Sequence, residues 1–435
     1  MSYLKKRQNL LSDCPIQEVE EAFSRIAHHF GDAWLEKESG THALQILWNR
    51  RDALSTNELF TFGKSLIAAE SASSNWLKGQ IKLVRGKDEN NQKGAVFEIL
   101  AVGYTASRQS VIPAPANQPG YDIDIETQKG TRYRASLKRY SQSLHEKLFL
   151  KKSAHAEDKF IDGLKRSGYN ALLYIEAKEY PDEADWQLLY QVMYQLGSTF
   201  KGSKQIIEIR SRWLVGLLPL APEPNEIFST DHISHSFICS SPYHNNEQNN
   251  FLSKLESAVS NLERHVACNL ERVPIIIMQL PVTASASILT SWAQEYLNSN
   301  KSSALEAVFF LQPYNASNTD MSSSHIAYFA STAVSDSFHA RANQRLEFEV
   351  PVGIVTTQPP KWRLISDIGQ QQLSAQYVYQ QGKLYVLASS DGAGSLSAHV
   401  TRKAPRIETI AVFNLKGQNR MLRGRWGEQL SLIGG

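Results

Sequence analysis

The strongest constraint on the fold is a pair of alternating runs, residues 121–127 (YDIDIET) and 131–140 (TRYRASLKRY), separated by a short polar turn with one glycine. Side chains in a β-strand point alternately to the two faces of a sheet. In both runs the odd-numbered residues are mostly apolar and the even-numbered ones are charged or polar, which predicts a β-hairpin with one apolar and one charged face. A register that keeps like faces together places Asp122 opposite Ser136 or Lys138.

The charged face of this hairpin brings carboxylates and basic side chains together. Its members are Asp122, Asp124, Glu126, Arg132, Arg134 and Lys138. Neighbouring carboxylates repel one another, and a divalent cation is one way to hold them together. The alternative is a ladder of cross-strand salt bridges, in which each pair contributes only about 0.2–1 kcal/mol.

A further carboxylate, Glu98, lies in an otherwise apolar stretch, residues 94–104 (GAVFEILAVGY), which has the pattern of a buried helix. A buried carboxylate is costly without a partner, so Glu98 should be paired, protonated or bound to a metal. The alternative is a partly exposed residue on an amphipathic helix.

The order of elements in this part of the chain resembles a known family. A helix at 94–104, the hairpin, a helix at 155–167 and a strand at 170–177 follow one another, with the spacing GAVFE…PGYDID…SLK. This order is similar to the core of the PD-(D/E)XK nuclease superfamily. The resemblance implies a restriction-endonuclease-like αβββαβ core in an α/β protein. The first strand of that core, before the aspartate, is not evident.

The resemblance also implies site residues. It assigns Glu98 to the helix position, Asp122 to the acidic strand position, with Asp124 as its rival, and Lys138 to the lysine. The chain departs from the pattern at Ser136, where the family usually has Glu or Asp. A serine is a poor ligand for a hard cation, so one metal-binding carboxylate is lost, and Asp124 or Glu126 would have to substitute.

The implied activity is Mg²⁺- or Mn²⁺-dependent hydrolysis of DNA, most naturally double-stranded, by an endonuclease or a nuclease-like subunit of a restriction or phage-defence system. Asp122, Asp124 and Glu98 are the candidate metal ligands. Basic residues near the hairpin would meet the DNA backbone; these are Arg132, Arg134, Arg139, Lys147, Lys151 and Lys152. A solvated basic surface is the alternative. Because of Ser136, a catalytically degenerate DNA-binding or scaffolding subunit is the second candidate, and a partner subunit or a homodimer fits both.

Weaker signals lie elsewhere in the chain. Glu176-Ala177-Lys178 repeats the acidic tripeptide, but its place after the second helix indicates a structural strand end. A segment rich in imidazole and thiol groups could bind zinc, although its spacing is looser than in most structural zinc sites; its members are His232, His235, Cys239 and His244. The C-terminal Arg420, Arg423, Arg425 and Trp426 suggest a nucleic-acid contact or, more commonly, a tryptophan packed between solvated arginines.

The composition and length of the chain indicate the class of protein and the number of domains. The chain has 435 residues, of which 42% are hydrophobic and 20% charged, as in globular proteins of two or three domains. We expect a helical region at 1–88, the nuclease-like core at 89–182, an α/β region at 183–338 that includes a strand-helix-strand element, and a β-rich region at 339–435 with hairpins. No membrane span or signal peptide is evident, and three scattered cysteines predict a cytoplasmic protein. A net charge of +3 requires any nucleic-acid surface to be local.

Overall fold

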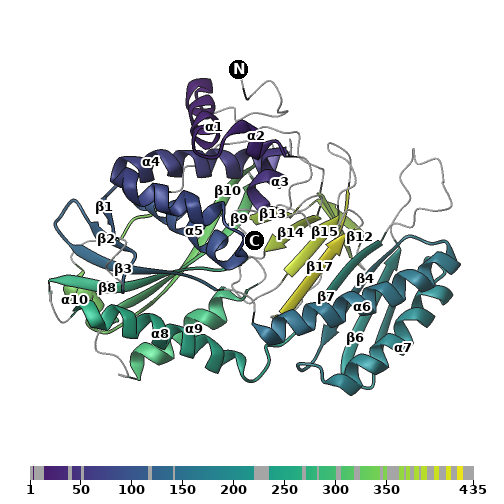
Figure 1. Ribbon diagram of the computed structural model, residues 1–435. Helices are drawn as coiled ribbons and strands as arrows, with labels where there is room; N and C mark the ends of the chain where they lie inside the picture. The colour runs from purple at the N-terminus through teal and green to yellow at the C-terminus, as the bar shows by residue number, and fades with distance from the viewer. Residues whose placement is uncertain are drawn as a thin grey trace.

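The computed structural model is a mixed α/β protein (Figure 1). It describes residues 3, 14–37, 42–49, 53–115, 120–140, 143–219, 235–266, 271–281, 284–299, 305–317, 324–342 and 346–349, and after these the short strands β11–β17. Its helices are α1 (Ile16–Phe30), α2 (Asp32–Leu35), α3 (Ala43–Asn49), α4 (Ala53–Val84), α5 (Glu89–Ala106), α6 (Leu144–Ser167), α7 (Glu183–Thr199), α8 (Glu247–Val266), α9 (Ala286–Asn298) and α10 (Phe338–Arg341). Within the described residues, no helix is both long and apolar enough to cross a membrane.

The first sheet has the strand order β1-β2-β3-β8-β9-β10. Its strands are β1 (Ser110–Pro113), β2 (Ile123–Glu126), β3 (Arg132–Arg139), β8 (Arg272–Gln279), β9 (Ala307–Ser317) and β10 (Ser324–Val334). Strands β1, β2 and β3 are antiparallel, β3, β8 and β9 are parallel, and β10 returns antiparallel to β9. The predicted strand-helix-strand element is therefore confirmed as β8, α9 and β9.

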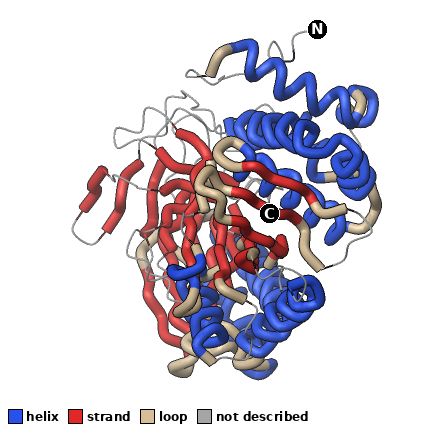
Figure 2. The backbone as a smooth tube through the Cα atoms, turned by 90° about the vertical axis from the view of Figure 1, so that its left-hand side faces the viewer, coloured by secondary structure: helices blue, strands red, loops and turns tan. Residues whose placement is uncertain are grey.

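Helices cover both faces of this sheet (Figure 2). The predicted N-terminal helices α1, α3 and α4 form one layer together with α5, and they pack on the apolar face of the hairpin through residues such as Ile123, Tyr133 and Leu137. Helices α8 and α9 pack on the opposite face against Ile276 and Met278 of β8. The result is a three-layer arrangement with the first sheet between the two layers of helices.

The hairpin forms with the predicted register. Ile123 lies opposite Ala135, Asp124 opposite Arg134, and Glu126 opposite Arg132. The amide of Asp122 donates to the carbonyl of Ala135 at 2.9 Å, one residue out of this register, so the ladder is irregular at Asp122 as in a β-bulge. The strand that the sequence did not reveal, β1, pairs with β2 along residues 110–113.

The expectation that the helix at 155–167 and the strand at 170–177 complete the hairpin sheet is wrong. Both elements form, as α6 and β4 (Ala171–Ala177), but β4 lies in a second sheet of order β17-β7-β4-β6-β5. The parallel neighbour of β3 is β8 instead. Residues 89–182 thus contribute to two sheets, because two apolar runs have the same local pattern and only long-range pairing decides which one joins β3.

The second sheet has its own core. It comprises β4, β5 (Gln205–Ile209), β6 (Trp213–Pro219), β7 (His235–Ser241) and β17 (Asn419–Gly424). Helices α6 and α7 cover one face, where Phe149, Trp186 and Trp213 are fully buried. In Figure 1 this unit lies to the right of the first sheet, and all of its elements except β17 lie between β3 and α8 in the sequence.

A third sheet, of order β12-β11-β16-β15-β14-β13, accounts for most of the predicted β-rich C-terminal region. Its strands are β11 (Trp362–Ser366), β12 (Gly369–Gln372), β13 (Tyr377–Gln381), β14 (Leu384–Ala388), β15 (Leu396–Val400) and β16 (Glu408–Val412). One predicted hairpin forms between β13 and β14. The second hairpin expected in this region would join β16 to β17, but β17 pairs with β7 of the second sheet.

Candidate active site

Asp122 is held at the start of β2 by the strands on both sides. Its carbonyl accepts from the amide of Ala114 at 2.9 Å, and its own amide bonds to β3. Its carboxylate oxygen Oδ2 accepts from the amide of Leu137 at 2.5 Å and from the Ser136 hydroxyl at 3.3 Å. The same oxygen lies 3.6 Å from Nζ of Lys138. All of these side-chain contacts use Oδ2, which leaves Oδ1 available for a ligand.

Glu98 reaches the same place from α5, where it is partly buried. Its Oε2 accepts a hydrogen bond of 2.8 Å from Nε2 of Gln80 on α4. Burial and the nearby charge of Asp122 raise the pKa of Glu98 to about 7, although Lys138 and the Gln80 hydrogen bond act in the opposite direction. Glu98 is thus a carboxyl group that titrates near neutral pH beside a second carboxylate, as expected for a functional group rather than a surface residue.

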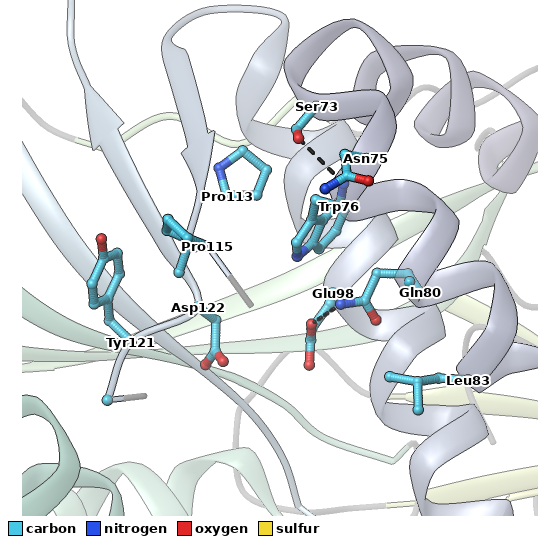
Figure 3. Close-up of a pocket in the computed structure, with 13 residues that line it drawn as sticks. Ser73, Asn75, Trp76, Gln80, Leu83, Glu98, Pro113, Pro115, Tyr121 and Asp122 are labelled. Carbon is cyan, nitrogen blue, oxygen red and sulfur yellow. Dashed lines mark hydrogen bonds between the residues drawn. The ribbon is translucent and has the colours of Figure 1, made fainter. Parts of the chain in front are cut away.

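A cavity of about 670 Å³ is lined by the two carboxylates and by residues of α4. Figure 3 shows Glu98 and Asp122 pointing into this space from the helix side and the strand side. Helix α4 contributes to the wall because it is interrupted at Ser73, whose backbone is extended. The Ser73 hydroxyl accepts from the amide of Trp76 at 3.3 Å and so caps the second half of the helix.

The donor set fits a hard divalent cation with several retained waters. Mg²⁺ prefers oxygen ligands in octahedral geometry and is often held by only one or two carboxylates. Oδ1 of Asp122 and Oε1 of Glu98 are the two oxygens that the described contacts leave available. Among the described residues there is no group of three or more His, Cys, Asp or Glu side chains placed to bind a metal.

Asp124, the third predicted ligand, is engaged elsewhere. Its Oδ1 accepts from Nε of Arg134 at 3.0 Å, and its Oδ2 accepts from Nη2 of Arg134 and Nη1 of Arg272. The next pair along the strands, Glu126 and Arg132, is bridged at 3.2 Å. The hairpin therefore contains two rungs of the salt-bridge ladder, and only Asp122 faces the cavity.

Two of the residues predicted to contact a DNA backbone, Arg132 and Arg134, take part in these ion pairs. The Arg134 side chain is 9% exposed, bound to Asp124 and stacked over the ring of Tyr121. Arg132 bridges Glu126 and also lies 3.8 Å from Glu271. Alternation correctly placed both arginines on the charged face, but it could not tell that β8 and Arg272 complete an ion-pair network there.

The remaining predicted basic residues follow the hairpin. Burial lowers the pKa of Arg139 to about 10, which leaves the group protonated at neutral pH. Lys147 and Lys151 are exposed on α6, whereas Lys152 pairs with Glu183 of α7. Lys147 and Lys151 are therefore the predicted DNA-contacting residues whose charge is most accessible.

The weaker signals do not join this site. Glu176 and Ala177 end β4, and Lys178 pairs with Glu208 on β5 of the second sheet, in line with a structural strand end. Cys239 is buried in the core of that sheet, and burial raises its pKa to about 12. His244 stacks on His145 with ring centroids 3.6 Å apart. His232, the side chain of His235, those of Arg420 and Arg423, and residues 425–426 lie outside the described part of the structure.

Two residues of the site carry no recognisable signal in the sequence. Gln80 and Trp76 lie on α4 within a stretch that has only the pattern of a helix. A glutamine on an amphipathic helix does not indicate a functional site, because such residues are common on solvated helix faces. The interruption of the helix at Ser73 is not marked by proline or glycine, so the sequence does not reveal it either.

The pKa of Glu98 predicts how stability depends on pH. Between 4.5, its ordinary value, and about 7 the folded protein binds a proton at Glu98 that the unfolded chain has lost. The stabilisation from this proton is complete below 4.5 and is lost as the pH rises to about 7. In EDTA, the Glu98→Gln variant should therefore gain stability relative to the wild type between pH 5 and pH 8, as measured by urea unfolding. A constant difference across this range, like that expected of the surface control Asp158→Asn, would contradict the assignment.

No family model matches the chain, and neither curated proteins nor solved structures gave a match. The geometry of the site is thus the basis for the functional conclusion.

Proposed function

We propose that the chain is a metal-dependent endonuclease that hydrolyses phosphodiester bonds in DNA. The observation that carries the proposal is the convergence of Glu98 and Asp122 on one cavity, with Nζ of Lys138 on the adjacent strand 3.6 Å from Asp122. Two carboxylates with available oxygens and a neighbouring ammonium group are the parts that metal-assisted phosphoryl chemistry requires.

Each residue then has a distinct task. Asp122 and Glu98 would hold Mg²⁺ or Mn²⁺, which supplies polarisation of the phosphate and a lowered pKa of bound water. Lys138, 3.6 Å from Asp122 and 38% exposed, would orient the attacking water or stabilise negative charge on the phosphate. Ser136 cannot replace a carboxylate, and its hydroxyl instead fixes the orientation of Asp122.

The order of elements also supports the proposal. Helix α5, the antiparallel strands β1, β2 and β3, helix α8 and strand β8, parallel to β3, follow the αβββαβ order of the PD-(D/E)XK resemblance, with four strands of the second sheet, β4–β7, inserted between β3 and α8. The exposed Lys147 and Lys151 begin that insertion and would contact the DNA backbone. A cytoplasmic role in restriction or phage defence, with a partner subunit or as a homodimer, is the corresponding proposal for context.

The second candidate is a degenerate nuclease that binds DNA without cutting it. It is favoured by one observation: Ser136 stands at the position of an acidic residue, and Asp124 is tied to two arginines and does not substitute. A site with two carboxylates would then bind a cation weakly and leave catalysis to a partner.

A cleavage assay on supercoiled plasmid with Mg²⁺ or Mn²⁺ tests the proposal. We expect nicking that EDTA abolishes and that Lys138→Ala reduces by at least about 100-fold, because a positioned charge at the reacting phosphate is lost. Lys159→Ala, an exposed lysine on α6, is the matched control and should retain activity. Salt-sensitive DNA binding without nicking would favour the degenerate candidate, and neither binding nor nicking would overturn both.

A further inference from the structure

The cavity extends well beyond the two carboxylates, and the rest of its wall has a different chemistry. A volume of about 670 Å³ is within the range of about 300–1,000 Å³ typical of small-molecule sites. None of the described residues that line it is a lysine or an arginine. A wall without positive charge is poorly suited to the phosphate backbone itself, so the space should take an uncharged part of a ligand.

The wall is largely apolar and aromatic. Trp76 and Leu83 come from the second half of α4, and Pro113, Pro115 and Tyr121 come from the strand side. Figure 3 shows Trp76 on the helix side of the space and the two prolines with Tyr121 across from it. Flat aromatic and proline surfaces on opposite sides of a cavity suit a flat, apolar-faced group.

Polar groups at the edges of this space suit a heteroaromatic ring. Asn75 offers an amide at the cavity wall. Gln80 is only 8% exposed, and its Oε1 is buried without a hydrogen-bond partner, while its Nε2 holds Glu98. Because this oxygen is buried, it is not accessible from the cavity, and the polar group that a ligand can reach on this side is the amide of the exposed Asn75.

We propose that this cavity, the Trp76 pocket, takes one unpaired nucleobase of the substrate strand, next to the phosphate at Asp122 and Glu98. The inference rests on the proposed function and names its substrate more closely. A nucleobase is flat, uncharged and edged with donors and acceptors, as the wall requires. A base stacked and paired within a duplex cannot enter such a pocket, so the substrate is single-stranded, or unpaired, at the site of cleavage.

Binding in EDTA tests this without any need for cleavage. Three fluorescently labelled probes are compared by anisotropy: single-stranded oligodeoxycytidine, a chain of abasic deoxyribose phosphates of the same length and charge, and a duplex of that length. Cytosine carries an amino group that can donate to the side-chain oxygen of Asn75. We expect the oligodeoxycytidine to bind at least fivefold more tightly than either of the other probes.

Variants connect this preference to the pocket. Trp76→Ala should weaken binding of oligodeoxycytidine by about 5- to 150-fold, the range that corresponds to the loss of one stacked base, and leave the abasic chain unaffected. Trp76→Phe should retain most of the affinity because it keeps an aromatic face, which also separates a stacking role from a folding defect. Tyr169→Ala is the matched control, since Tyr169 is a 44% exposed aromatic residue on the inserted unit.

Equal affinity for the oligodeoxycytidine and the abasic chain would overturn the proposal, as would tighter binding of the duplex or binding of none of the probes. The experiments distinguish a failure of the catalytic proposal from a failure of the nucleobase pocket. Base-dependent binding through Trp76 without metal-dependent cleavage would remove only the catalytic proposal. Cleavage of duplex DNA that does not depend on Trp76 would remove only the pocket.

Discussion

Replacing Asp122 with asparagine should abolish Mn²⁺ binding and reduce cleavage by at least about 100-fold, while the protein remains folded. Asparagine keeps an oxygen that can accept the amide of Leu137 and the hydroxyl of Ser136, so the junction between β2 and β3 is preserved. What it removes is the negative charge and the second carboxylate oxygen. Glu98 alone would then be a weak ligand, because a single carboxylate remains and burial still raises its pKa.

Calorimetric titration with Mn²⁺ and the plasmid assay would measure the two effects separately. Glu126→Gln is the matched control, because Glu126 lies on the same face of the same strand but is 44% exposed and paired with Arg132. It should change neither quantity. If Asp122→Asn bound Mn²⁺ as the wild type does and lost only a little stability, Asp122 would have only a structural role as a further cross-strand ion pair. The assignment of Asp122 as a metal ligand would then be contradicted.

The part of the site that could be predicted is the part that depends on local pattern. Apolar and polar residues that alternate along a strand show which side chains share a face of the sheet. The register of the hairpin follows, because the apolar residues of both strands must lie on the same face. The pattern of the two strands therefore suffices to place Asp122, Ser136 and Lys138 together. Glu98 is equally conspicuous, because it is a single carboxylate in an otherwise apolar helix.

What could not be predicted depends on contacts between distant segments. Strand β1 is short and ends in Pro113, so its sequence resembles a loop. Strand β3 pairs with β8, which is separated from it by residues 140–271, and not with β4. Both candidate strands are apolar, so their sequences do not show which of them is the neighbour of β3. For the same reason, no pattern within the hairpin could tell that Arg272 on β8 would reach Asp124 and turn a possible metal ligand into the centre of an ion-pair network.

This network leads to the largest expected effect on stability. Asp124→Ala should lower the free energy of unfolding by about 3–5 kcal/mol, because it leaves two guanidinium groups without their carboxylate. The side chain of Arg134 is 9% exposed and that of Arg272 is 25% exposed, so water compensates little at the first and only partly at the second. The variant should still bind Mn²⁺, provided that it is studied well below its unfolding temperature.

Urea unfolding of a small set of variants would test whether burial is the cause. Glu126→Ala removes the neighbouring rung, whose partners are 44% and 47% exposed, and should cost only about 0–1 kcal/mol. The double variant Asp124→Leu/Arg134→Leu removes the most buried pair as a unit and should be less destabilised than Asp124→Ala, since the cost of a broken buried pair comes mainly from the charge left behind. Equal losses for Asp124→Ala and Glu126→Ala would contradict this account. Asp124 would then be a surface residue like its neighbour, and its exclusion from the metal site would lose its physical basis.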